Sequence, residues 1–385
     1  MILLLFVLSL AAFAGARLSD SLLGTDFPDF YCAARMLAAG HGHQLYDAAA
    51  QRQCQAHYTG RVGTLYIHPP FEAVVYLAVA WLPLRRAYLL WSFLSLAFLA
   101  AAVRRVANDN LLPWDWRLVL AASLTFVPAL LCLVQGQDSL LLLWLVVLAF
   151  TALRGGRAFA AGCWLGLGLF KFELVLPLVL VLALTQSGSS RTGLAKGFCL
   201  VALALAGLSA AICGWSVFAA YPEFLAHLRD QPFAGISPQA MANFRGLAYF
   251  FFHRESSWVI GVVSILSIAA LITTLTYWRT ARVVASGRDD FDRAFAVTVV
   301  CALLVSYHLN PHDLSLLLLP MLLLCGEAAG TKTNSSRLWI IALSAILFLP
   351  PLHLLALQWH AYVLVSIPLT ALFAVGTTRR GDSCA

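Results

Sequence analysis

The chain has 385 residues, of which 61% are hydrophobic and only 11% are charged. Because an ordinary soluble domain carries about 25% charged residues, this composition excludes a water-soluble globular protein and predicts an all-α polytopic membrane protein. The formal charge of +7 comes mainly from arginine, and in a membrane protein such an excess is typical of cytoplasmic loops that follow the positive-inside rule. No nucleic-acid partner is therefore expected.

Residues 1–16, MILLLFVLSLAAFAGA, form the first apolar run. The run ends in Ala-Gly-Ala, as a signal peptide does, but no basic residue precedes its apolar part, which favours a retained first transmembrane helix. With either interpretation, the segment after Arg17 is delivered to the outer side of the membrane.

The polar stretch 17–70 follows and includes TDFPDFYCAARMLAAGHGHQLYD at residues 25–47. Asp26, Asp29 and, more loosely, Tyr31 can share one side of a helix at spacing i, i+3 and i+5. A helix N-cap would explain one of these side chains but not the group. The cluster, with Arg35 close behind it, is therefore a candidate functional segment.

The run 71–84 has only 14 residues and ends at Pro83. A spanning helix needs about 20 apolar residues, so we expect a short outer-face helix or re-entrant element here. His68 precedes two prolines, which predicts extended backbone. Taken alone, a histidine at the position of His68 is more often a satisfied interface residue than a catalytic one.

The remaining apolar runs predict about twelve crossings, with both termini in the cytoplasm. The runs are 1–16, 87–103, 117–134, 139–153, 158–170, 174–186, 195–216, 257–278, 294–307, 314–325, 337–355 and 361–377. With the basic loops inside, four polar segments join 17–70 on the outer side. They are QGQD (135–138), KFE (171–173), the long loop 217–256 and SYHLNPHD (306–313).

Lys171 and Glu173 interrupt a long apolar sequence. Because an ionisable residue at membrane depth is costly, such a residue is a functional candidate, although a tight turn between two helices explains the pair equally well. Gly162, Gly166 and Gly168 precede them and predict close helix packing.

Polar residues of the last two segments suit anion binding better than metal binding. His308, His312 and Asp313 have a spacing that resembles a zinc site, but Pro311 interrupts the helix and a third ligand is missing nearby. We therefore expect no metal. Arg245, with Asn243 just before it, offers a planar fork suited to phosphate or carboxylate. Cys32 and Cys54 could form a disulfide if 17–70 faces an oxidising compartment, and the sequence leaves this open.

Six segments in order resemble glycosyltransferase family 87, which belongs to the GT-C class of multispanning glycosyltransferases. They are DFPDFYCAARMLAAGHGHQLYD, IHPPFEAVVYLAVAWLP, QGQDSLLLLWLVVLAF, AAGCWLGLGLFKFELVLPLVL, NFRGL and YHLNPHDLSLLLLP. The similarity runs along nearly the whole chain. It implies one GT-C transmembrane domain over 1–385, with the catalytic segment in 17–70 and a second long outer loop at 217–256.

The resemblance implies transfer of a sugar, usually mannose, from a polyprenyl-phosphate carrier to a hydroxyl of a lipid or glycan acceptor. It also implies a location in the inner (plasma) membrane with an extracytoplasmic active site. The family's catalytic aspartate matches Asp26, while Asp29 is a second carboxylate where the pattern departs. A single carboxylate base with direct displacement predicts inversion, and no cofactor is expected.

The leaving phosphate requires cationic or hydrogen-bonding groups. The candidates for this role are Lys171, Arg245, His308, His312, His68 and Arg35. The candidates for supporting contacts are Tyr31, Gln137, Asn243 and Asp313.

Two alternatives stay open at this stage. A pentosyl donor such as an arabinofuranosyl carrier would change the sugar but not the chemistry. A transporter or flippase would also have many helices and buried charges, although the two halves of this chain show no internal repeat.

Overall fold

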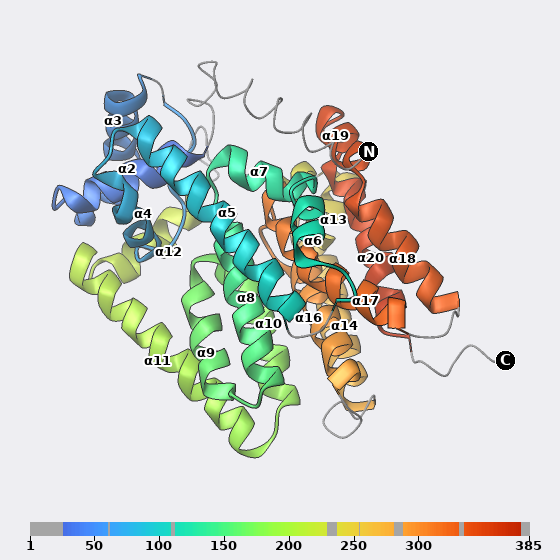
Figure 1. Cartoon of the computed structure of the whole chain (residues 1–385). Helices are drawn as coiled ribbons and strands as arrows, with labels where there is room; N and C mark the ends of the chain where they lie inside the picture. Colours follow the sequence, from blue (N-terminus) through green and yellow to red (C-terminus); the bar gives the residue numbers. More distant parts are fainter. Residues whose placement is uncertain are drawn as a thin grey trace.

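The structure is a computed structural model that describes residues 26–60, 62–108, 112–228, 237–253, 255–280, 288–330 and 335–378. In these ranges the regular elements are helices, and no β-strand occurs, as predicted (Figure 1). The expected crossing at 1–16 lies outside the described residues.

The α-helices follow one another from α2 to α20 (Figure 1). Their bounds are α2 Phe27–Ala38, α3 Ala48–Thr59, α4 Glu72–Ala80, α5 Leu84–Asn108, α6 Trp116–Ser123, α7 Val127–Gln135, α8 Ser139–Arg154, α9 Ala158–Leu167, α10 Phe172–Thr185, α11 Gly188–Cys213, α12 Val217–Ala226, α13 Phe244–Phe252, α14 Ser257–Thr280, α16 Arg288–Val305, α17 Leu318–Gly330, α18 Ser335–Phe348, α19 Pro350–Gln358 and α20 Ser366–Gly376. The short 3-10 helices are η2 Gly42–Gln44, η3 Gly168–Lys171, η5 Pro238–Ala240, η6 Pro311–Leu317 and η7 Tyr362–Val365.

Five described stretches are long and apolar enough to cross a membrane: Leu84–Asn108, Ala158–Thr185, Gly188–Cys213, Ser257–Thr280 and Pro311–Ala329. Two bent helix pairs raise the number to seven if each pair is one span. The chain is therefore a multi-pass membrane protein, but the predicted number of twelve crossings is not confirmed. Several predicted runs, such as 139–153, form helices shorter than a full span.

The two bent pairs are α6 with α7, at 67°, and α18 with α19, at 49°. The second bend follows directly from the sequence. Leu349 precedes Pro350, and a residue before proline is pushed out of the helical region, here to ψ 121°. The apolar run 337–355 therefore contains two helix axes instead of the single one that apolarity predicted.

The spans differ in how much of their surface other helices cover. Within the apolar window of Pro311–Ala329, 72% of residues are buried, whereas the figure for Ser257–Thr280 is only 17%. The first is thus a central helix of the bundle, and α14 is a peripheral one that presents apolar side chains outward.

The prediction of a short element at 71–84 is confirmed, because α4 has only nine residues. At 1.5 Å per residue it is about 13 Å long, less than half of the roughly 30 Å hydrocarbon core. It packs against α2 and α5 at one corner of the molecule (Figure 1). The Tyr76 ring stacks on Phe30 at 4.6 Å and lies 4.2 Å from the Trp91 ring, which fixes α4 between those helices.

The predicted glycine packing is also confirmed, at the contact between α9 and α11. A Cβ atom on Gly162 would lie 2.1 Å from the carbonyl oxygen of Leu194, and one on Gly197 would lie 2.1 Å from that of Phe159. Only glycine lets the two backbones approach this closely. The contact holds α9 against α11, and η3 follows directly after α9 in the chain.

Gly197→Ala is expected to destabilise the protein by about 1–3 kcal/mol, because the added methyl group must push two backbones apart. Gly207→Ala is the matched control in the same helix, since its Cβ would meet nothing within 4 Å. Thermal unfolding in detergent checks the pair: a lower Tm is expected for the first variant only. Equal Tm values would show that the close contact is not needed.

Cys32 and Cys54 do not form a disulfide in the structure, where both are free thiols. The Sγ atom of Cys54 lies 3.7 Å from the carbonyl oxygen of Cys32 instead, so the two residues do connect α2 to α3.

The backbone leaves helical geometry at Lys171, which has φ −113° and ψ 58°. By length and apolarity 158–185 passes as one span, yet this residue ends η3 and starts α10 as a separate helix. Figure 1 shows α9 and α10 as neighbouring columns. The interruption predicted at KFE is therefore present, and it places Lys171 and Glu173 where two helices meet.

Candidate active site

Asp26 immediately precedes α2 but does not cap it, because its side chain accepts no backbone N–H of the helix. Its Oδ2 instead accepts a hydrogen bond of 2.7 Å from Nε2 of Gln137, which is 111 residues away in sequence. Burial raises the pKa of Asp26, and the Gln137 bond and the nearby Lys171 and His68 lower it in part. Among the described residues, Gln137 is the one that donates a hydrogen bond to this carboxyl.

Asp29 has a different environment, although it lies only three residues further on, in the first turn of α2. It is 5% exposed and accepts hydrogen bonds from Gln55 and Thr64, which tie α2 to α3 and to the segment after it. Burial raises its pKa well above the usual range. The geometry thus separates the two predicted carboxylates: Asp29 connects α2 to α3 and to the segment after it, whereas among the described residues Asp26 is bonded through one oxygen, to Gln137.

Lys171 lies inside the bundle, 2% exposed, between two carboxylates. Its Nζ is 3.2 Å from Oδ1 of Asp313 and 3.7 Å from Oδ1 of Asp138. Asp138 was not among the predicted site residues, although its place beside Gln137 between two apolar runs is a signal that could have identified it.

Asp313 accepts a hydrogen bond at each of its two carboxylate oxygens. Ser139 Oγ donates to its Oδ1 at 2.7 Å, and the backbone N–H of Asn310 donates to its Oδ2 at 2.8 Å. The neighbouring His312 is 1% exposed, and its Nδ1 is 2.7 Å from Oε1 of Gln135 at the end of α7. These bonds join η6 to α7 and α8 next to Lys171, which contacts Asp313.

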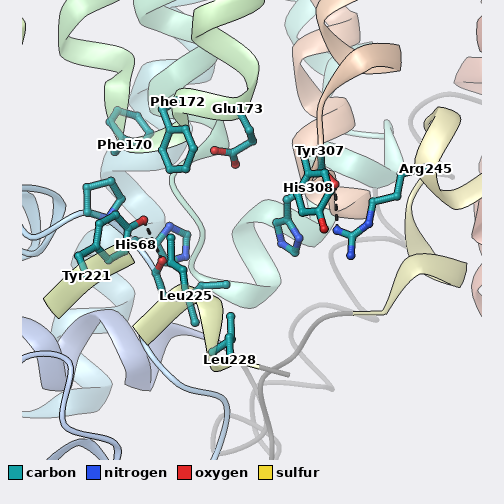
Figure 2. Close-up of a pocket in the computed structure, with 12 residues that line it drawn as sticks. His68, Phe170, Phe172, Glu173, Tyr221, Leu225, Leu228, Arg245, Tyr307 and His308 are labelled. Carbon is teal, nitrogen blue, oxygen red and sulfur yellow. Dashed lines mark hydrogen bonds between the residues drawn. The ribbon is translucent and has the colours of Figure 1, made fainter. Parts of the chain in front are cut away.

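A cavity of about 180 Å³ opens beside this cluster. It is lined by Ile67, His68, Pro69, Phe170, Phe172, Glu173, Tyr221, Leu225, Leu228, Arg245, Tyr307 and His308. Figure 2 shows His68 on one side of the cavity, with His308 and Arg245 on the opposite side. The wall is mostly apolar and aromatic, and its ionisable side chains include His68, Arg245 and His308.

Arg245 is held firmly at the cavity. Its Nε lies 2.6 Å from Glu255, its Nη1 donates to the carbonyl oxygen of Tyr307 at 3.0 Å, and its guanidinium lies 4.0 Å from the Tyr307 ring centre. Burial lowers the pKa of His308 to about 4, so this imidazole is neutral near pH 7. A fixed guanidinium beside a neutral imidazole suits the recognition of an oxyanion.

Three predicted site residues have their partners elsewhere. Arg35 donates to the Tyr58 hydroxyl and to the carbonyl oxygen of Ala80. The Tyr31 hydroxyl donates to Leu82 at 2.9 Å. Asn243 caps α13 by accepting from the Gly246 N–H, and it donates to the carbonyl oxygen of Ser306. It therefore fixes the start of the helix that carries Arg245.

Asp26 is not among the described residues that line the cavity, but its neighbour His68 is. His68 lines the cavity and also lies close enough to Asp26 to affect its pKa. Within the part of the chain that the structure describes, no three His, Cys, Asp or Glu side chains are grouped so that they could hold a metal ion.

The sequence model of glycosyltransferase family 87 matches residues 66–308. The chain belongs to this family. No curated protein and no solved structure matches the chain.

Membership of family 87 makes the protein a membrane glycosyltransferase. The matched residues include the whole cavity wall, from Ile67 to His308, together with Gln137, Asp138 and Lys171. Asp26 lies before the matched range, and His312 and Asp313 lie after it. For this glycosyltransferase, the cavity is therefore the candidate binding site of a substrate with an apolar part and an anionic part.

Proposed function

We propose that this family 87 glycosyltransferase moves a sugar, with mannose as the expected sugar, from a polyprenyl-phosphate donor to a hydroxyl group of a lipid or glycan acceptor. The reaction takes place on the extracytoplasmic side of the plasma membrane and inverts the anomeric centre. The observation that supports this best is the Asp26 carboxyl, which is held by Gln137 and lies within electrostatic range of His68; His68 lines an apolar cavity together with a fixed arginine.

Asp26 is the proposed general base. An acceptor hydroxyl is a weak nucleophile at neutral pH, and a positioned carboxylate can take its proton as the oxygen attacks the anomeric carbon. Gln137 uses one oxygen of Asp26 and holds the carboxyl in place, and the other oxygen can accept the proton.

The leaving group is a phosphate, so it needs stabilisation of negative charge rather than protonation. Arg245, His308 and His68 are the proposed phosphate contacts, because they line the cavity. Lys171 and His312 are assigned an indirect role, because both already have partners inside the bundle. Lys171 contacts Asp138 and Asp313, and His312 contacts Gln135. Arg35 is left out of this role because it is not among the described residues that line the cavity, and it donates to the Tyr58 hydroxyl instead.

The apolar wall suits the first isoprene units of a polyprenyl chain. Phe170, Phe172, Leu225 and Leu228 surround the cavity on the side away from Arg245 (Figure 2). Burial of this apolar surface would favour a lipid carrier over a soluble sugar nucleotide.

The test uses purified protein in nanodiscs with a panel of polyprenyl-phosphate sugars, including mannose and arabinofuranose, and lipid acceptors. Transfer from the mannosyl donor with inversion, read by NMR of the product, is the expected result. Transfer from the pentosyl donor alone would assign a different sugar. Movement of the lipid between leaflets without any transfer would support the transporter alternative and reject the proposal.

A further inference from the structure

Glu72 is a fully buried carboxyl that no role in the proposed reaction explains. Both of its oxygens are buried without a hydrogen bond to a described group, and its side chain is 0% exposed. Nδ1 of His68 lies 3.1 Å from its Oε2. The carboxyl of Asp138 is close enough to form a hydrogen bond with that of Glu72, and its Oδ1 is likewise buried without a hydrogen bond to a described N–H or hydroxyl group.

The charges of this cluster do not balance if every acid is ionised. Lys171 is the ammonium group in contact with it, and the closer of its two carboxylates is Asp313. Asp313 also accepts from Ser139 and Asn310, so it has the donors that favour a carboxylate. Neither oxygen of Glu72 accepts a hydrogen bond from a backbone N–H or a hydroxyl group of a described residue, and an uncompensated buried carboxylate is costly. The neutral arrangement leaves the protons on Glu72 and Asp138.

The titration of the two groups outside the spanning helices agrees with this. Burial raises the pKa of Glu72 to about 8, and burial lowers the pKa of His68 to about 4. Near pH 7 both groups are therefore neutral. When Asp138 donates to Glu72, the proton of Glu72 is directed toward Nδ1 of His68, which lies 3.1 Å away. A neutral imidazole that accepts at Nδ1 must have its proton on Nε2.

We propose that Asp138, Glu72 and His68 form a chain of neutral hydrogen bonds that fixes His68 in its Nε2–H form. In this chain Asp138 donates to Glu72, Glu72 donates to Nδ1 of His68, and His68 offers Nε2–H to an oxygen atom of the ligand in the cavity. Glu72 and Asp138 are positioning residues. That the ligand oxygen belongs to the donor phosphate or sugar rests on the proposed function.

The chain is sensitive to pH through Glu72. Above about pH 8 Glu72 ionises, becomes an acceptor for Nδ1–H, and leaves a lone pair on Nε2 facing the ligand. The groups that face Glu72 are Asp138, Lys171, Glu173, Asp313, Tyr46, Tyr66, Tyr76 and Tyr221. Lys171 is the one positive charge among these described groups, and it is shared with Asp138 and Asp313, so it does not hold Glu72 ionised at neutral pH.

The direct test reads the tautomer itself by ¹⁵N NMR of histidine-labelled protein, with His68→Gln used only to assign the His68 signals. The expected result at pH 7 is an Nε2–H imidazole that changes to Nδ1–H as the pH rises through about 8. In Glu72→Gln the amide N–H donates to Nδ1 at every pH, so Nε2–H should persist above pH 8. An Nδ1–H form at pH 7, or the same pH change in Glu72→Gln, would overturn the proposal.

Kinetics give the second readout. The kcat/KM for the lipid donor is expected to fall at least tenfold between pH 7 and 9 in the wild type but not in Glu72→Gln, and Glu72→Leu should show a raised KM at every pH. An alkaline fall that persists in Glu72→Gln would contradict the role of Glu72. Because the NMR measurement needs no substrate, a protein that transfers no sugar yet shows the predicted tautomer would reject the function and keep this inference.

Discussion

Asp26→Asn is expected to abolish sugar transfer, with a loss of about 10²–10⁴-fold in turnover, because an amide cannot accept the proton of the acceptor hydroxyl. The Asn side chain keeps a carbonyl oxygen for the Gln137 amide, which donates to Oδ2 in the wild type. Folding and donor binding should therefore be retained. Radiolabelled sugar transfer in nanodiscs measures the first effect, and binding of the polyprenyl-phosphate donor measures the second.

Asp29→Asn is the matched control three residues away. Asp29 accepts from Gln55 and Thr64, and an Asn oxygen can keep one of these bonds, so this variant should retain activity with somewhat lower stability. An active Asp26→Asn with an inactive Asp29→Asn would move the base to Asp29. Full activity of both variants would reject both Asp26 and Asp29 as the base.

The same assignment gives a direction for the pH profile. Burial raises the pKa of Asp26, and the base must be ionised to act. Turnover is therefore expected to fall as the pH drops through this raised pKa, at a higher pH than an ordinary exposed aspartate would give.

Lys171→Met is expected to lower the free energy of unfolding by about 3–5 kcal/mol, the usual cost of removing one partner from a buried ion pair. The reason is that Asp313, which lies 3.2 Å from Nζ of Lys171, would keep a buried negative charge without its counter-ion. Chemical or thermal unfolding in detergent checks this value.

Lys196→Met serves as the control, because Lys196 lies exposed on α11 and should change stability little. The same experiment also separates two roles for Lys171. If Lys171→Met unfolds like the wild type but loses affinity for the donor, Lys171 binds the phosphate directly and the ion cluster is not needed for stability.

Local features of the fold were predictable from sequence wherever a single residue type controls geometry. The short element before Pro83 and the close approach at Gly162 were both predicted, because chain length and the lack of a Cβ atom decide them. The number of crossings was not confirmed. Apolarity cannot show that Leu349 turns the chain before Pro350 or that a run stops short of a span.

The site was predictable only in part. Ionisable residues in apolar runs stand out because their burial is costly, so Lys171, Asp313 and Asp26 could be selected from the sequence. Which of them meet could not be predicted, because the pairing of Gln137 with Asp26 spans 111 residues. Asp138 and Glu72 were missed as partners for the same reason.

The exposed side of α14 has a consequence for how such sequences diverge. Its outward residues Ile265, Ile268 and Ile272 are each more than half exposed. Side chains that face lipid tails need only to be apolar, so one apolar residue can replace another at these positions during evolution. Relatives are then expected to keep few identities along such helices, and recognition of distant homologues must depend on the sparse polar segments between them.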